Sequence, residues 1–300
     1  MLNLVKTVMR RHNILWSGRK EPPMHYGRRS DLALEAKELF ESSAGKTTQL
    51  SGVRAREETL FGYPLTRVDI LDETGAEALG KPVGRYVTVD LGPYFRREAD
   101  YFDRGVRCLA GELAALLPEG PVLAAGLGNR AMTCDAVGPA SIDNLLVTRH
   151  MIRAMPRQFA DFRPVAAVCP GVLARTGLEA LELVRGAVER VRPAAVIAVD
   201  ALAARDSARL CATVQLSDTG LVPGSGVGNR RSALDRGTLG VPVIAVGIPT
   251  VVDADPRAGL FLTPRDIDQR IRELGRLLGY GITLALQPSL TAADITALLG

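Results

Sequence analysis

Short, uninterrupted apolar runs alternate with amphipathic segments through the second half of the sequence. An apolar run without polar alternation is typical of a strand buried on both faces, and the segments between the runs carry apolar residues at helical spacing. Parallel strands joined by crossover helices produce this alternation. We therefore predict an α/β fold with a mostly parallel sheet flanked by helices. The strand-like runs are 122–127, 165–168, 194–199, 212–216 and 241–246.

The first half of the sequence predicts a smaller β element and two helices. Two β-like runs, 66–71 and 85–91, are separated by a connection that contains Gly and Pro, so we predict a small antiparallel β element near residues 66–91. Helical spacing of apolar residues predicts helices that begin near Leu32 and at Tyr101. Further helices are expected at 140–152, 177–191, 263–278 and 291–299.

Basic residues concentrate at the N-terminus. Residues 1–30 contain seven Lys or Arg and one acid, Glu21, whereas the rest of the chain contains 30 basic and 32 acidic residues. Such a tail is an arm for nucleic acid or membrane, or a removable segment that folds over its own body, and composition does not choose between them. We predict two parts, a basic segment 1–30 and a single α/β domain 31–300.

Several classes of protein are disfavoured by what the sequence lacks. No stretch approaches the ~18 uncharged apolar residues of a membrane-spanning helix, and no signal-peptide pattern opens the chain, so we expect a cytoplasmic protein without a membrane partner. The cysteines form no Cys-x-x-Cys pair, and no two histidines have zinc-peptidase spacing. These residues are Cys108, Cys134, Cys169 and Cys211, and His12, His25 and His150.

Two glycine-rich stretches resemble nucleotide-binding loops, but each lacks a required part. Residues 126–131 match the glycine fingerprint of dinucleotide-binding folds, yet residues 133–139 delay the helix that would hold the pyrophosphate. Residues 223–230 have Pro223 in place of the first Gly of a phosphate loop and Asn229 in place of its Lys. We predict no nucleotide site. The second loop instead exposes backbone N–H groups that could hold a peptide or a developing oxyanion.

Three aspartates follow strand-like runs. Asp135 lies in the loop after the first run of the sheet, and Asp200 and Asp218 end two others. Ligands of open α/β sheets bind outside the carboxyl ends of the strands, so Asp135 and Asp200 are expected to face one crevice. The structural alternatives are a helix N-cap for Asp200 and a turn residue for Asp135. The tripeptide Asp218-Thr219-Gly220 also occurs in pepsin-like proteases, but those are all-β proteins, and we interpret it as coincidence.

The chain resembles the germination proteases of spore-forming bacteria. The resemblance spans about residues 30 to 255 and follows the same order along the chain. Its strongest blocks are Gly126-Leu127-Gly128-Asn129, Asp135-Ala136-Val137-Gly138-Pro139 and Asp200-Ala201-Leu202-Ala203-Ala204-Arg205, and further blocks are 30–36, 78–84, 144–150, 170–173, 217–220, 223–229 and 247–253.

The resemblance implies an endopeptidase that degrades small acid-soluble spore proteins at germination. It further implies a zymogen that removes its own N-terminal pro-segment, here 1–30, a homotetramer, the spore core as location, and a fold similar to that of hydrogenase maturation endopeptidases. The essential aspartates of the family correspond to Asp135 and Asp200. Two departures matter: Val222 stands where the family usually has His, and Glu21 is the only acid that could mark a processing site in the tail.

Amide hydrolysis without a nucleophilic Ser or Cys requires an activated water. Two nearby carboxylates that share one proton supply both a base and an acid, so we predict that Asp135 and Asp200 are catalytic, without a resident cofactor. One alternative holds a divalent metal at the same two residues, as in a maturation endopeptidase that acts on one partner protein. Another is a DNA-binding tail on an inactive body. Candidate substrate-pocket residues are Asn129, Asp218, Thr219 and Gly226.

Overall fold

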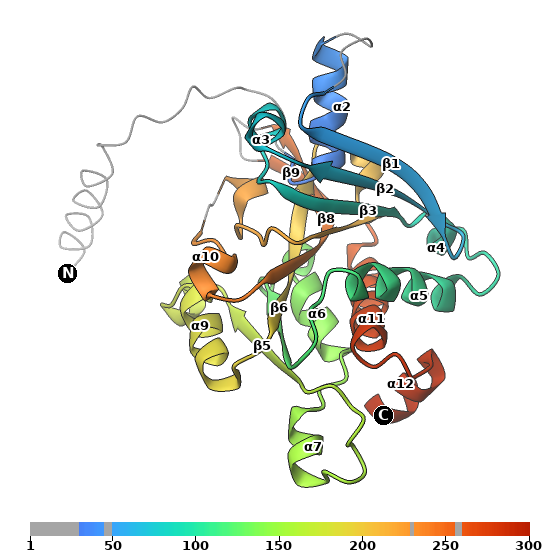
Figure 1. The fold of residues 1–300 in the computed structure, drawn as a ribbon. Coiled ribbons are helices and arrows are strands. Elements are labelled where there is room, and N and C mark those ends of the chain that lie inside the picture. The colour runs from blue at the N-terminus through green and yellow to red at the C-terminus, as the bar shows by residue number, and fades with distance from the viewer. Residues whose placement is uncertain (1–29, 45–49, 229–230, 256–259) are drawn as a thin grey trace, which may run out of the picture.

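The computed structural model describes residues 30–44, 50–228, 231–255 and 260–300 (Figure 1). The predicted basic segment 1–30 therefore lies outside the described residues, except for Ser30. Within the described ranges, no helix has the length and apolar character needed to cross a membrane.

A single nine-stranded sheet runs through the described chain. Its strand order is β1-β2-β3-β7-β8-β6-β4-β5, and β9 pairs with β8 outside this order. The strands are β1 Val53–Leu60, β2 Tyr63–Ile70, β3 Gly84–Asp90, β4 Val122–Leu127, β5 Val165–Gly171, β6 Ala195–Ala204, β7 Thr213–Ser217, β8 Val243–Asp255 and β9 Leu260–Leu262.

The α/β class is confirmed, but the sheet is mixed and its parallel part is smaller than predicted. Strands β5, β4, β6 and β8 are parallel, whereas β7 runs antiparallel to both β8 and β3. The run 212–216 was expected in the parallel part. Only a short connection with one 3-10 turn, Ser207–Arg209, joins β6 to β7, and a parallel crossover needs a longer connection, usually with a helix.

The predicted antiparallel element forms the other end of the same sheet. Strands β2 and β3 pair as expected, β1 adds a further strand, and β3 joins the element to β7. The sequence of β1 carries charges on both faces, and most of the strand is exposed, so it lacks the apolar pattern that reveals a strand. Helices α2 (Ala33–Ala44) and α3 (Glu73–Leu79) pack on this part around Val68 and Tyr86.

Helices cover both faces of the parallel part (Figure 1). The larger core lies between the sheet and α5 (Tyr101–Ala114), α6 (Val137–Asp143), α11 (Ile267–Leu286) and α12 (Ala292–Leu299). The smaller core lies on the opposite face, under α9 (Ala180–Val191) and α10 (Arg236–Leu239). The apolar runs at 122–127 and 194–199 therefore have buried side chains on both faces, as their sequences predict. Short helices α4 (Gly92–Phe95), α7 (Arg149–Ala154) and α8 (Leu173–Thr176) lie in the connections.

The helix predicted at 140–152 is divided into α6 and α7. The main-chain N–H of Leu146 donates to Thr283 Oγ1 of α11, and the Thr148 hydroxyl accepts from Val165 N–H and donates to the Arg163 carbonyl. These contacts draw residues 144–148 onto α11 and the start of β5. The continuous helix is therefore broken by tertiary contacts that helical spacing does not reveal.

Candidate functional site

Asp200 lies inside strand β6, not beyond its end. β6 continues through Ala204 because it pairs with β8 as far as Val252, whereas its pairing with β4 ends at Val199. The Asp200 side chain is 6% exposed, and its Oδ1 accepts a hydrogen bond of 2.9 Å from the N–H of Ala201. Since a strand follows Asp200, the helix N-cap alternative is excluded. Asp200 is a carboxylate in a buried strand next to the carboxyl end of β4.

Asp135 is returned to the same place by a tight turn. After β4 the chain passes through Gly128, and a 3-10 turn at Thr133–Asp135 folds back so that the Asn129 N–H meets both Asp135 Oδ2, at 2.9 Å, and the Asp135 carbonyl, at 3.0 Å. Gly128 has a φ of 109°, and a Cβ there would lie 2.0 Å from the Asp135 carbonyl oxygen. Only glycine fits at this position.

The turn that carries Asp135 is also fixed from β8. The buried Thr250 hydroxyl donates a hydrogen bond of 2.6 Å to the carbonyl of Cys134. Asp135 therefore lies on a turn held by β4 on one side and β8 on the other, next to β6, which lies between these two strands.

The charge of Asp135 affects the ionisation of Asp200. Burial raises the pKa of Asp200 well above its ordinary range, the negative charge of Asp135 raises it further, that of Asp31 adds to this, and the Ala201 N–H opposes the shift. Burial also raises the pKa of Asp135, against the N–H of Asn129, which favours the ionised form. Burial therefore favours the protonated form of both carboxyl groups, and most strongly that of Asp200.

The glycine-rich loop reaches the same strand. Gly226 is buried in a 3-10 turn, Ser225–Val227, and a Cβ there would lie 2.1 Å from Asp31 Oδ2 and 2.5 Å from the Ala203 Cβ of β6. The sequence predicted Gly226 near the crevice but missed Asp31. Asp31 follows no strand-like run, so the argument that selected Asp135 and Asp200 does not reach it.

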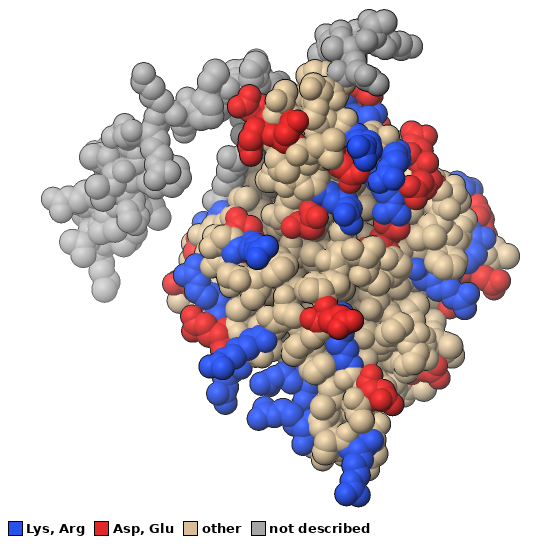
Figure 2. All heavy atoms as spheres, viewed as in Figure 1, with Lys and Arg blue, Asp and Glu red and all other residues tan. Residues whose placement is uncertain are grey.

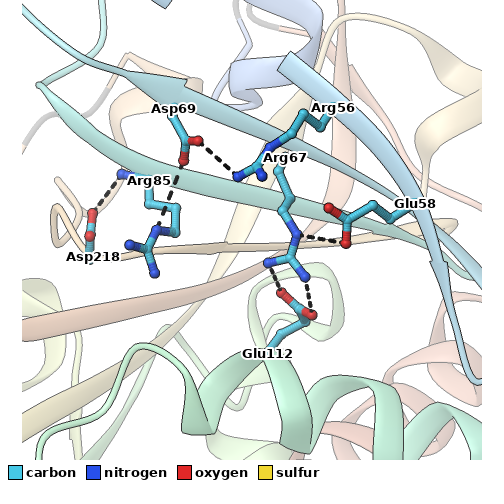
Figure 3. A network of polar contacts seen from close by, with 7 residues as sticks. All are labelled: Arg56, Glu58, Arg67, Asp69, Arg85, Glu112 and Asp218. Carbon is cyan, nitrogen blue, oxygen red and sulfur yellow. Dashed lines mark hydrogen bonds and ion pairs between the residues drawn. The ribbon is translucent and has the colours of Figure 1, made fainter. Parts of the chain in front are cut away.

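The structure does not bring Asp218 and Thr219 to this place. Gln215 and Asp200 both pair with Gly247, and β7 then runs antiparallel to β8, so residue 218 lies toward the amino end of β6. Asp218 Oδ1 accepts the Arg85 N–H at 2.8 Å at the start of β3 (Figure 3). The Thr219 hydroxyl donates to Ser217 Oγ at 3.3 Å.

Asp218 instead lines a groove of about 620 Å³ on the antiparallel end of the sheet, beside β1, β2 and β3. Two arginines of the groove lie at one acid: Arg56 donates to Asp69 at 3.3 Å, and Arg85 lies 3.9 Å from the same carboxylate (Figure 3). Figure 2 shows basic and acidic side chains interleaved over β1 and β2. This face therefore does not present a field of one sign of the kind that nucleic acid binding requires.

The donor set at the crevice does not match a structural or catalytic zinc site. Nowhere in the described ranges do three His, Cys, Asp or Glu side chains come together in a group that could hold a metal ion. Such sites usually supply three or four protein ligands.

The cysteines near the crevice are not activated nucleophiles. Burial raises the pKa of the Cys134 thiol, and the charge of Asp135 raises it further. Burial also raises the pKa of Cys169, against the opposing effect of Arg130. A reactive cysteine needs a lowered pKa, so these two thiols are not activated for nucleophilic attack.

Comparison with known proteins gives relatives along almost the whole chain. The sequence model of the germination protease family matches residues 33–259. The germination protease of Caldanaerobacter subterraneus is 41% identical over 91% of this chain and 98% of its own length. That of Clostridium perfringens is 36% identical over 91% and 99%. The solved [NiFe] hydrogenase maturation protease HycI of Thermococcus kodakarensis aligns with 59% of this chain and 99% of its own at 17% identity, with a TM-score of 0.37.

Proposed function

The chain belongs to the germination protease family, and on that premise we propose that it degrades small acid-soluble spore proteins by an aspartic mechanism. Membership of the family makes the chain an endopeptidase of germination. The observation that carries the mechanism is the placement of Asp135 on a turn next to β6, the strand of Asp200, together with the raised pKa values of both carboxyl groups.

We assign Asp200 as the acid and Asp135 as the base. Asp200 is the deeper of the two, and burial together with the charge of Asp135 favours its protonated form. The N–H of Asn129 favours the ionised form of Asp135. Ionised Asp135 takes a proton from the attacking water, while Asp200 donates a hydrogen bond to the scissile carbonyl. Asp135 then passes its proton to the leaving nitrogen.

Removal of either carboxyl group is expected to abolish cleavage. Asp135→Asn and Asp200→Asn each remove one titrating group without changing the side-chain shape, and kcat for a small acid-soluble spore protein should fall by at least ~100-fold, the usual contribution of general acid–base catalysis. Circular dichroism and thermal melting monitor the fold.

Asp218→Asn is the matched control. Asp218 accepts a hydrogen bond from the main-chain N–H of Arg85 and lies toward the amino end of β6, away from the two aspartates. Its kcat/KM should remain within about threefold of wild type, as for most surface changes. Full activity in Asp135→Asn or Asp200→Asn would rule out the dyad.

The metal-dependent alternative keeps the same two aspartates. It predicts that exhaustive chelation removes activity and that one divalent ion restores it, whereas the aspartic mechanism predicts activity without added metal. The related alternative, a maturation endopeptidase with a single partner, predicts no cleavage of any member of a panel of small acid-soluble spore proteins. The chelation assay separates the aspartic from the metal-dependent mechanism, and the panel separates both from a maturation endopeptidase with a single partner.

We further propose that the protein is a homotetramer, acts in the cytoplasm of the spore core, and is made as a zymogen whose segment 1–30 is removed. All three proposals follow from the resemblance to the germination protease family. Glu21, the one acid of that segment, lies outside the described residues, as does the segment itself apart from Ser30. N-terminal sequencing of the active enzyme identifies the processing site, and light scattering gives the number of 32.1 kDa chains in the assembly.

A further inference from the structure

The side chain of Asp31 joins two segments that are remote from it in sequence. Its Oδ2 accepts a hydrogen bond of 2.9 Å from the N–H of Ala203 on β6, and its Oδ1 accepts one of 2.7 Å from the hydroxyl of Ser225 in the glycine-rich loop. The Asp31 N–H also donates to the Ala203 carbonyl at 2.9 Å. One carboxylate therefore bonds both the strand of Asp200 and the loop beside it.

The fit between these segments leaves no spare room. A Cβ at Gly226 would lie 2.1 Å from Asp31 Oδ2 and 2.5 Å from the Ala203 Cβ. The loop can lie this close to β6 only because residue 226 has no side chain. The loop is thus seated on Asp31 and Ala203 together.

Asp31 is itself held firmly from outside the loop. Its carbonyl accepts from Lys81 Nζ at 2.9 Å and from Gln215 Nε2 at 3.1 Å. The next residue, Leu32, is fully buried in a cluster with Ala204 and Val252. The carboxylate is therefore a fixed point of the body, to which the loop is attached.

We propose that Asp31 is a positioning residue that holds the glycine-rich loop 223–228 against β6 beside Asp200. The loop packs on the strand that carries Asp200, so we expect loss of the Asp31 contacts to act mainly on substrate binding. This inference rests on the active site proposed above, because it takes Asp200 as the reacting centre.

Two substitutions at residue 31 separate the effect of its side-chain hydrogen bonds from the effect of its negative charge. Asp31→Ala loses both side-chain contacts, and its kcat/KM should fall by at least ~10-fold, mainly through KM, as expected for loss of hydrogen bonds to a charged group. Asp31→Asn should stay within about threefold of wild type. Its amide oxygen accepts from the Ala203 N–H and its NH₂ donates to Ser225 Oγ. If Asp31→Asn is as impaired as Asp31→Ala, positioning is refuted.

The Ser225 hydroxyl provides a second, milder variant. Ser225→Ala should raise KM in the same direction as Asp31→Ala, and the double variant should be no worse than Asp31→Ala, since both remove the same contact. Additive losses would contradict the proposal. If Asp31→Ala does not fold, Ser225→Ala and Asp31→Asn still carry the test. Asp161→Asn, at an exposed aspartate, is the control and should behave as wild type.

Hydrogen exchange gives a readout that is independent of activity. Amides of residues 223–228 should exchange faster in Asp31→Ala than in wild type, with β4 unchanged. Unaltered exchange together with wild-type KM would overturn the role of Asp31. Full activity of Asp200→Asn would instead overturn the proposed active site and leave the loop measurement standing, so the two failures are distinguishable.

Discussion

Asp200 is a carboxyl group in a strand whose neighbouring residues are all apolar. The sequence predicted that Asp135 and Asp200 share one edge of the sheet, because each follows a strand-like run and ligands of open α/β sheets bind at the carboxyl ends of the strands. It could not predict that the strand continues, since Ala201 to Ala204 have no β preference. Pairing with β8, and the two hydrogen bonds that Asp31 makes to the main chain of Ala203, keep this segment extended. Those partners lie far away in sequence.

The burial of Asp200 predicts a pH-dependent gain in stability when it is replaced. A carboxyl group whose pKa is higher in the folded than in the unfolded chain contributes stability below the unfolded pKa, about 4, and loses it as pH rises toward the folded pKa. Asp200→Asn does not titrate, so its Tm should exceed that of wild type at neutral pH. The difference should vanish near pH 4. A Tm difference that is constant between pH 4 and 8 would contradict this account.

Helix α6 is the element that connects the two aspartates, because it packs directly on β4, which precedes Asp135, and on β6, which contains Asp200. A Cβ at Gly138 would lie 2.3 Å from the Leu127 carbonyl oxygen of β4 and 2.5 Å from the Val199 carbonyl oxygen of β6. The sequence predicted a helix here but not its length, because contacts of Leu146 and Thr148 end it early. The spacing of apolar residues shows which face of a helix is buried. It does not show where a neighbouring element will form hydrogen bonds with the main chain and end the helix.

Gly138→Ala is expected to displace α6 and with it Asp135. The methyl group meets backbone on two strands, which cannot yield as a flexible side chain does, so the free energy of unfolding should fall by about 1–3 kcal/mol, as for overpacked cores. Cleavage should fall with it. Gly186→Ala on α9 is the control, since nothing lies within 4 Å of its Cβ position, and it should be neutral or stabilising by up to ~1 kcal/mol. Urea denaturation of both variants measures the difference, and equal effects would contradict the packing argument.

One sheet runs through the described chain, and a largely buried ion pair joins its antiparallel end to helix α5. Arg67 of β2 donates to both oxygens of Glu112 on α5, at 2.6 and 2.7 Å (Figure 3). The sequence predicted both elements, yet the connection of the antiparallel element to the main sheet was outside its reach, because β3 pairs with β7 across a long interval of chain. Local patterns specify elements, and long-range pairing specifies their assembly.

Loss of this ion pair should weaken the molecule more than loss of a surface pair. Glu112→Ala removes the carboxylate, only 4% exposed, that binds Arg67 and leaves the guanidinium with the exposed Glu58 at 3.3 Å, so the expected loss is about 1.5–3 kcal/mol. Glu41→Ala removes an exposed i,i+4 pair with Lys37 and should lose at most ~1 kcal/mol. Chemical denaturation gives both values, and similar losses would show that Arg67 finds another partner.

The attachment of Asp31 to Ala203 bears on where an affinity tag belongs. Any polypeptide fused immediately before Ser30 begins beside the strand that carries Asp200. A bulky N-terminal fusion at that point would crowd the crevice and reduce access of a protein substrate. The C-terminus follows α12, beyond α11 and at the opposite end of the molecule from α2 (Figure 1). Purification and surface immobilisation through the C-terminus therefore keep the attached group away from the start of α2 and from Asp31.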